Sequence, residues 1–393
     1  MTALKAGGSP GECENGQASA RRGTALLPIV KEGLIKLLAA IGSKSPLPPE
    51  RVNRAKIGSI LVIRQHDQLG DFLLATPVLQ ALRDRFPAAR IGVLVRDSFS
   101  DVLTGHPLVD EILIIPKTTG QWNLRRLRAL FRGLVGKWDM AVVLNTVSHS
   151  LTSDVLAVLS GSRFVLGSEH RTFGGVRENF FYNLRAPYTT SFRHQTDRNL
   201  DIVRYIGADT RNRSEAMYLS PAERKGAEQR LALLGIDRKK PVIALHIGAG
   251  KPKNRWPAAR FGQLATRIHK ELKAQVLVCW GRAEGDLAAD FSAHAKFRPF
   301  MLPPGDLRAL AAAFLQCNLL VCNDTGMLHV GAAAGVPVVA VFGPTDPREW
   351  KPIGEKIVAV GSKTGETRDV PVSAVFAAVR KLFATRVRRR SGT

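Results

Sequence analysis

Residues 323–329 place a carboxylate, a hydroxyl and a glycine together in one short turn, Asn-Asp-Thr-Gly-Met-Leu-His. An apolar run, residues 319–322, leads into this turn, and a run of small residues, 330–335, follows it. A second apolar run comes at 337–342. This order predicts a strand, a polar turn, a helix and a strand. Because the first turn of a helix has unpaired N–H groups and a partial positive charge, the turn suits a phosphate or diphosphate.

A second loop, residues 64–71, ends in Gly70 and Asp71 between a predicted strand and a predicted helix. A carboxylate there can take a proton from a hydroxyl that attacks an electrophile, as a general base does. It can also simply cap the helix, and the residues alone favour this interpretation. The loop has neither the Gly-x-Gly-x-x-Gly spacing of a dinucleotide-binding turn nor the Lys-Ser/Thr of a P-loop, which argues against a dehydrogenase and an NTPase.

A third loop, residues 246–257, combines glycines with Lys251, Lys253 and Arg255. Glycines let a backbone approach a phosphate closely, and the cations can neutralise its charge. A solvated basic loop is the alternative, and the residues alone leave both interpretations open.

Two single side chains extend this group of candidates. Glu284, just after the apolar run 276–280, can bind ribose or sugar hydroxyls, or it can stabilise the start of a helix through the helix dipole. His329 can donate to a ligand oxygen, or it can be a structural histidine of the helix that follows the phosphate turn.

These loops need strands to position them. Apolar runs without alternation are typical of parallel strands covered by helices on both faces. We therefore predict an α/β fold with two doubly wound, Rossmann-like domains facing a cleft, and ligands at the carboxyl ends of the strands. One helix is expected at 72–86. The expected strands are 60–63, 91–95, 112–115 and 140–144 in a domain at 58–206, and 242–247, 276–280, 319–322 and 338–342 in a domain at 207–385.

The ends of the chain have a different composition. Residues 1–57 are expected to form a disordered N-terminus, an amphipathic helix at 25–41 and a Pro-rich linker, and residues 386–393 a basic tail. The charges within 25–41 are incompatible with a membrane span. Its apolar face suits either an anionic membrane surface or packing on the protein's own body.

The whole chain is strongly basic, with 57 Lys and Arg against 33 Asp and Glu, a formal charge of +24. Such an excess suggests a polyanionic neighbour, or it serves only solubility. Nucleic acid is not expected, because the basic residues do not cluster with stacking aromatics in a known motif. The four cysteines have no zinc-binding spacing, which is typical of reduced thiols in the cytosol.

Taken together, these motifs resemble glycosyltransferase family nine, the bacterial lipopolysaccharide heptosyltransferases. The resemblance spans roughly residues 58 to 355, about the size of two domains. It rests on these segments: Leu69-Gly70-Asp71, Thr76-Pro77, Leu82-Arg83-Asp84-Arg85-Phe86-Pro87, Arg255-Trp256-Pro257, Asn323-Asp324-Thr325-Gly326 with His329, Ala332-Ala333, Gly335, Pro337, and Phe342-Gly343-Pro344-Thr345.

The resemblance implies a two-domain glycosyltransferase B fold, inverting chemistry, no cofactor and no catalytic metal. Donors in the family are typically ADP-heptoses, and acceptors are inner-core sugars of lipopolysaccharide. By resemblance, Asp71 is the general base and the turn Asp324-Thr325-Gly326 is the diphosphate site. One departure is Asn254, where family members usually carry Lys, so Lys253 or Arg255 is expected to supply that charge.

The resemblance thus implies a glycosyltransferase with Asp71 as base. The donor-binding set is Lys253, Arg255, Glu284, Asp324, Thr325, Gly326 and His329. The first domain is expected on the acceptor side, and the second is expected to bind the nucleotide sugar. Expected partners are a nucleotide-sugar donor, a glycolipid acceptor and an anionic membrane surface, with the protein cytoplasmic and peripheral on the inner face of the cytoplasmic membrane. The alternative is a non-catalytic protein that binds a nucleotide sugar or phosphoglycan.

Overall fold

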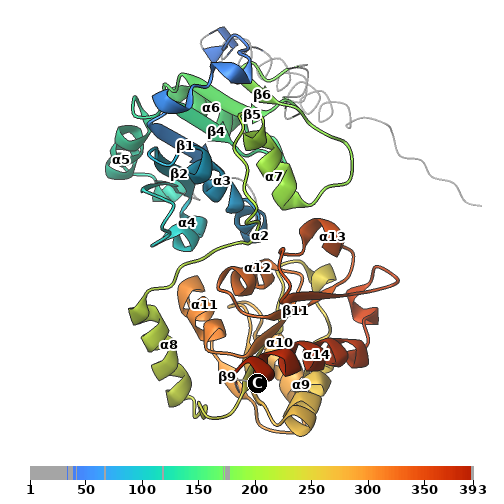
Figure 1. Cartoon of the computed structure of the whole chain (residues 1–393). Helices are drawn as coiled ribbons and strands as arrows, with labels where there is room; N and C mark the ends of the chain where they lie inside the picture. The colour runs from blue at the N-terminus through green and yellow to red at the C-terminus, as the bar shows by residue number, and fades with distance from the viewer. Residues whose placement is uncertain are drawn as a thin grey trace, which may run out of the picture.

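The structure is a computed structural model that describes residues 33, 39–40, 42–65, 68–116, 119–170, 172 and 178–390, with the backbone alone for 119 and 386–390. The predicted amphipathic helix at 25–41 lies almost wholly outside these residues, as do the first 24 residues and the last three. The described chain forms two α/β domains, one above the other in Figure 1.

The first domain is built on a parallel sheet in the order β3-β2-β1-β4-β5-β6. The central strands are apolar and buried on both faces, which is why they form continuous hydrophobic runs in the sequence. The strands are β1 (Ser59–Ile63), β2 (Arg90–Arg96), β3 (Glu111–Ile115), β4 (Met140–Val143), β5 (Phe164–Ser168) and β6 (Leu184–Ala186); the helices are α2 (Leu69–Leu73), α3 (Pro77–Arg85), α4 (Asp97–Leu103), α5 (Leu124–Leu134), α6 (Leu151–Leu159) and α7 (Gln195–Arg204).

The second domain repeats this arrangement with the order β12-β11-β10-β7-β8-β9, again all parallel. Its strands are β7 (Val242–His246), β8 (Gln275–Cys279), β9 (Phe300–Leu302), β10 (Leu319–Asn323), β11 (Val338–Phe342) and β12 (Ile357–Gly361). Its helices are α8 (Pro221–Leu233), α9 (Ala258–Leu272), α10 (Gly285–His294), α11 (Leu307–Leu315), α12 (Gly326–Ala333), α13 (Pro347–Trp350) and α14 (Val372–Arg390). Short 3-10 turns are η1 (Pro49–Arg51), η2 (Arg54–Lys56), η3 (Thr119–Gln121), η4 (Pro252–Asn254) and η5 (Thr367–Asp369).

Each sheet has its first and fourth strands side by side at the centre. The strand order therefore reverses between β1 and β4 in one domain and between β7 and β10 in the other. Crevices at such reversal points, outside the carboxyl ends of the strands, are where doubly wound folds bind ligands. The predicted fold class, two doubly wound domains, is confirmed.

Two details differ from the sequence-based expectation. The helix expected at 72–86 is two helices, α2 and α3, because Pro77 starts a new helix and has no N–H to continue the previous one. The strands β5, β6, β9 and β12 were not predicted from the sequence. Three of them lie at sheet edges, and β6 and β9 have only three residues each, too few to give a hydrophobic pattern.

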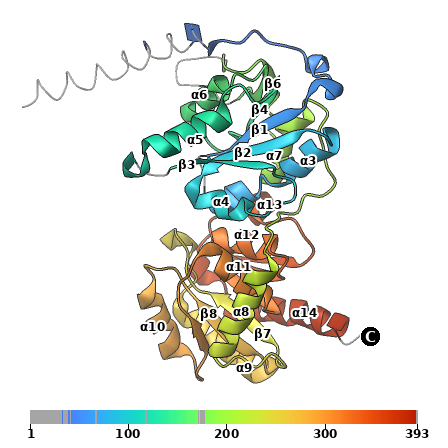
Figure 2. The same cartoon turned by 90° about the vertical axis from the view of Figure 1, so that its left-hand side faces the viewer.

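The domains touch at several points. On one side, Arg308 of α11 donates to the backbone oxygens of Asp101 (2.6 Å) and Thr104 (3.1 Å), at the end of α4. On another, Nε2 of His194 lies 2.7 Å from the backbone oxygen of Lys351. Between them, α2 of the first domain faces α12 of the second, as Figure 1 shows. Both of these helices follow strands at the reversal points. Figure 2 shows the two domains from the side.

Candidate active site

Asp71 lies in the first turn of α2, just after the loop that follows β1. Its Oδ2 accepts a hydrogen bond from the backbone N–H of Gln68 at 3.1 Å, so the side chain does cap its helix. Capping and base chemistry do not exclude each other, because a carboxylate has two oxygens and capacity for several hydrogen bonds. The side chain is partly exposed, so an incoming hydroxyl has access to it.

The helix α12 lies directly opposite α2. A methyl carbon built on Gly70 would lie 2.6 Å from Cδ2 and 2.8 Å from Nε2 of His329, closer than any real contact. One built on Gly326, the first residue of α12, would lie 3.3 Å from Leu69 of α2. Glycine is thus required at position 70 by the close approach of the two domains. The predicted base and the predicted diphosphate turn therefore lie at the same contact between the domains.

His329 is held by a buried carboxylate. Its Nδ1 lies 2.7 Å from Oε1 of Glu215, in the segment that links the domains, and both side chains are nearly inaccessible. Burial by itself would lower the pKa of His329, but Glu215, Asp324 and Asp71 together raise it. Burial also raises the pKa of Glu215. The predicted ligand residue His329 therefore has a structural partner, and its ring lies at the contact between the domains.

The diphosphate turn is tied to the basic loop of the same domain. The side-chain amide of Asn254 donates to the backbone oxygen and to Oδ2 of Asp324, each at 3.0 Å. Asn323 donates to the backbone oxygens of Ile247 and Gly248, both at 3.0 Å. These bonds link the loops after β7 and β10, the two strands at the reversal point. Asn254, at the position where the family resemblance led us to expect Lys, thus orients Asp324.

Asp324 itself is buried, and burial raises the pKa of its carboxyl group. The hydroxyl of Thr345 and the charges of His329 and Lys251 oppose that rise. The negative charge of Asp71, on the opposite domain, adds to that rise in the pKa of Asp324.

Two predicted donor-binding residues, Glu284 and Arg255, bind each other. Nη2 of Arg255 lies 3.3 Å from Oε1 of Glu284. The same carboxylate accepts the N–H groups of Ala249 (3.0 Å) and Gly281 (2.7 Å). Nε of Arg255 donates to the backbone oxygen of Ala249 at 2.7 Å. Glu284 therefore connects the loops after β7 and β8.

The three cations of the basic loop have different surroundings. Lys251 and Lys253 are exposed, while Arg255 is half-buried against Glu284. The charge of Lys251 lowers the pKa of Asp324, although Lys251 is not in the donor-binding set predicted from the sequence. Lys253 is fixed through its backbone, because its carbonyl oxygen accepts the hydroxyl of Thr367 at 2.7 Å. Lys251 therefore joins the candidate residues for phosphate binding.

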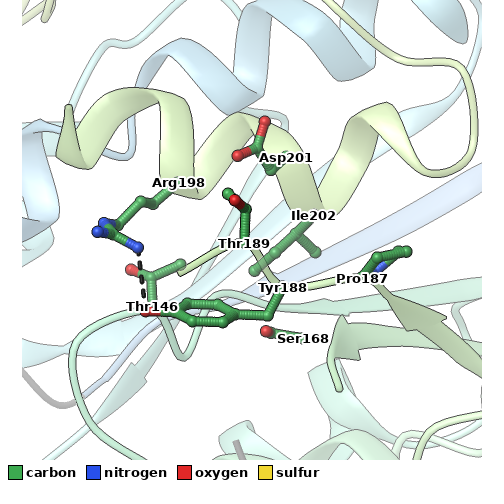
Figure 3. A pocket seen from close by; sticks show the side chains of 8 residues that line it. All are labelled: Thr146, Ser168, Pro187, Tyr188, Thr189, Arg198, Asp201 and Ile202. Carbon is green, nitrogen blue, oxygen red and sulfur yellow. Dashed lines mark hydrogen bonds between the residues drawn. The ribbon is translucent and has the colours of Figure 1, made fainter. Parts of the chain in front are cut away.

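A small pocket lies at the carboxyl end of the first sheet, where no site residue was predicted. Figure 3 shows hydroxyl-bearing side chains from the loops after β4 and β6 and the end of β5 converging beside α7. Nη1 of Arg198 donates to the Tyr188 hydroxyl at 3.0 Å. The pocket has a volume of about 20 Å³, which is enough for about one water molecule and too small for a sugar. Its lining is Thr146, Ser168, Pro187, Tyr188, Thr189, Arg198, Asp201 and Ile202.

Within the described part of the chain, no three His, Cys, Asp or Glu side chains gather in a way that could hold a metal ion. Nor do any of the helices described combine the length and apolar character that crossing a membrane requires.

The chain has relatives of known activity. It is 23% identical over 316 residues to lipooligosaccharide heptosyltransferase 2 of Haemophilus influenzae, covering 76% of this chain and 87% of the relative. It is 22% identical over 337 residues to lipopolysaccharide heptosyltransferase 3 of Escherichia coli, covering 80% of this chain and 96% of the relative.

Solved structures share the fold. The glycosyl transferase family 9 protein of Veillonella parvula matches with a TM-score of 0.73 and 24% identity, covering 84% of this chain and 97% of that one. The ADP-heptose heptosyltransferase II of E. coli matches with a TM-score of 0.66 and 21% identity, covering 83% and 99%.

The family model of glycosyltransferase family 9 (heptosyltransferase) matches residues 127–377, more than half of the chain. This range includes the diphosphate turn, the basic loop and Glu284, while Asp71 lies before it. With the two doubly wound domains and the relatives above, this match shows that the chain belongs to glycosyltransferase family 9, the heptosyltransferases.

Proposed function

We propose that this glycosyltransferase moves a heptose-type sugar from a nucleotide-sugar donor, with ADP as the nucleotide, to a sugar of a lipopolysaccharide core. The relatives are named as lipooligosaccharide and lipopolysaccharide heptosyltransferases, and one structural neighbour as an ADP-heptose enzyme. The acceptor is then a glycolipid, and the enzyme works at the inner face of the cytoplasmic membrane.

In the proposed reaction, Asp71 takes the proton of the attacking acceptor hydroxyl. The oxygen forms a bond to the anomeric carbon as the bond from that carbon to the diphosphate oxygen breaks, and its electron pair leaves with the nucleoside diphosphate. Attack from the face opposite the leaving group inverts the anomeric configuration. A base in hydrogen-bond reach of the hydroxyl contributes typically 10²–10⁴-fold to such a step.

Charge on the leaving diphosphate needs stabilisation, which we assign to the second domain without a catalytic metal. The N–H groups in the first turn of α12 and the Thr325 hydroxyl can bind phosphate oxygens. Lys251 and Arg255 add positive charge from the neighbouring loop. The carboxylate of Asp324, held by Asn254, is suited to accept a hydrogen bond from a hydroxyl of the transferred sugar.

One observation carries this proposal. Two helix N-termini, each following a strand at the reversal point of its own sheet, face each other, with the carboxylate of Asp71 on one and the diphosphate turn on the other. An acceptor hydroxyl bound on the side of Asp71 and a donor bound at the diphosphate turn would meet beside this contact between the domains.

The test is turnover of the purified protein with a panel of nucleotide sugars and a lipid A core acceptor, with the anomeric configuration of the product read by NMR. Asp71→Asn keeps the shape and the hydrogen bond from Gln68 but removes the base. We expect turnover to fall by roughly 10²–10⁴-fold with near-normal donor affinity. Asp84→Asn is the control, because Asp84 is an exposed carboxylate of the next helix, bonded to Gln80.

Near-normal turnover of Asp71→Asn would refute the assignment of the base. A product with retained configuration would refute inversion, and loss of turnover on adding a chelator would refute metal independence. Tight nucleotide binding without transfer for any donor would instead support a binding protein.

A further inference from the structure

The helix α5 has large apolar side chains directed into solvent. Leu124 is 70% exposed, Phe131 45% and Leu127 38%, in a molecule whose apolar side chains are otherwise mostly buried. These positions are spaced by three and four residues, so they lie along one face of the helix. Trp122 and Val135, just before and after the helix, are 39% and 49% exposed and extend the row. We call these five residues the apolar row.

The rotation of α5 about its axis is fixed by its inner face. Leu130 and Leu134 are buried against the sheet. A methyl carbon built on Gly133 would lie 2.2 Å from a methyl group of Leu113 in β3, so the helix and the strand are in tight contact there. The indole N–H of Trp138 donates to the backbone oxygen of Gly133 at 2.8 Å. The apolar row therefore cannot turn inward.

A row of cations runs beside the apolar row. Arg125, Arg128 and Arg132 are exposed, and their spacing of three and four residues places them on one helix face next to that row. The sequence contains no Asp or Glu between Glu111 and Asp139, so no acidic side chain from this segment neutralises them. An exposed apolar row flanked by cations is the pattern of a helix that lies in the interface of an anionic membrane.

We propose that α5 is the surface by which this enzyme docks on an anionic lipid bilayer. The apolar row enters the boundary between headgroups and acyl chains, and the three arginines bind lipid phosphates. The proposal rests on the proposed function, in which the acceptor is a membrane glycolipid. Figures 1 and 2 show α5 on the outer side of the first domain, away from the helices of the second domain, and Figure 2 shows it beside β3. Docking there keeps the expected acceptor-side domain at the membrane and leaves the second domain in the aqueous phase, where the nucleotide donor is.

The experiment is co-sedimentation of the full-length protein with vesicles of phosphatidylcholine alone and with added phosphatidylglycerol. Leu124→Ser/Phe131→Ser shortens the apolar row, and Arg125→Gln/Arg128→Gln/Arg132→Gln removes the cations. Each arginine is expected to contribute about fivefold to binding, so the triple variant should bind anionic vesicles about 100-fold more weakly. Added salt should weaken binding of the unmodified protein, because screening reduces the attraction.

Two matched controls lie on the second domain. Leu233→Ser removes an apolar side chain that is 90% exposed on α8, outside the apolar row. Arg238→Gln/Lys239→Gln/Lys240→Gln lowers the net charge by the same amount from three neighbouring exposed positions. Both controls should bind vesicles like the unmodified protein.

Unchanged vesicle binding by both α5 variants would overturn the proposal and assign any membrane contact to another part of the chain. If the unmodified protein does not bind anionic vesicles, the proposal is also overturned, and the exposed face of α5 would instead suit a protein partner. Circular dichroism and nucleotide binding check that each variant is folded. Transfer to a deacylated, soluble acceptor should be unaffected in the α5 variants, whereas Asp71→Asn should lose transfer and still bind vesicles, so the two proposals fail separately.

Discussion

Gly70→Ala tests the contact between the two domains with a single methyl group. The added carbon would lie 2.6 Å from Cδ2 and 2.8 Å from Nε2 of His329, whereas ordinary contacts begin at 3.4 Å. The histidine ring cannot move away freely, because it is buried and bonded to Glu215 at 2.7 Å. The variant must therefore shift α2, and Asp71 with it, by somewhat less than ~1 Å.

Two opposing effects set the magnitude. Overpacking of this kind costs about 1–3 kcal/mol of unfolding free energy. Replacing glycine by alanine inside a helix contributes up to about 1 kcal/mol in the other direction. In the unmodified background we expect a net loss of about 0–2 kcal/mol. In a His329→Ala background, where the ring is gone, the same substitution should stabilise the protein by up to about 1 kcal/mol.

The assay is a double-mutant cycle on Gly70→Ala and His329→Ala, with urea unfolding followed by tryptophan fluorescence. The expected coupling between the two substitutions is about 1–3 kcal/mol. Turnover is measured in parallel, because a displacement near 1 Å can cost about 10²-fold in rate. The double variant should recover part of the turnover that Gly70→Ala loses.

Additive effects, with a coupling below about 0.5 kcal/mol, would refute this reasoning. So would a Gly70→Ala enzyme that is more stable than the unmodified protein and equally active. Either result would mean that α2 and α12 do not approach as closely in solution as the structure has them.

Three further outcomes are expected. Gly326→Val should weaken binding of a nucleoside diphosphate, since the branched side chain blocks the N-terminus of α12; equal affinities by calorimetry would place the phosphate elsewhere. Arg255→Ala should weaken donor binding by roughly 1.5–3 kcal/mol, because the variant loses a charge-assisted hydrogen bond to the donor and the contacts that hold the loop. Lys253→Ala should weaken donor binding less, because Lys253 is exposed. If neither variant changes donor affinity or turnover, these cations do not bind the donor. The pKa values of Glu215 and His329 are both raised, so the folded protein binds these protons more tightly than the unfolded chain. The stabilisation from this tighter proton binding is fully present below the ordinary pKa values of Glu215 and His329, 4.5 and 6.5, and it is lost as pH rises through their raised pKa values in the folded protein. Urea titrations from pH 5 to 9 should therefore show that the unfolding free energy falls more steeply with pH for the unmodified protein than for Glu215→Gln.

Much of the architecture could be predicted from local pattern. The strands β1, β7, β10 and β11 are continuous apolar runs because each is buried on both faces of its sheet. A polar loop after such a strand must emerge at the sheet's carboxyl edge, so the loop ending in Asp71 and the turn at Asp324 could be placed from the sequence. The short edge strands could not, since three residues carry no period.

What each polar side chain in those loops binds was decided only by the tertiary structure. Asn254 and Asp324 are 70 positions apart, and His329 and Glu215 are 114 apart, yet both pairs are hydrogen-bonded. The sequence offered Glu284 and Arg255 as separate ligands, and the fold pairs them with each other. Nor does periodicity show that the outer face of α5 stays uncovered. Secondary structure follows from neighbours along the chain, whereas a hydrogen bond, an ion pair or an exposed face depends on which distant segment the packing of the whole chain brings alongside.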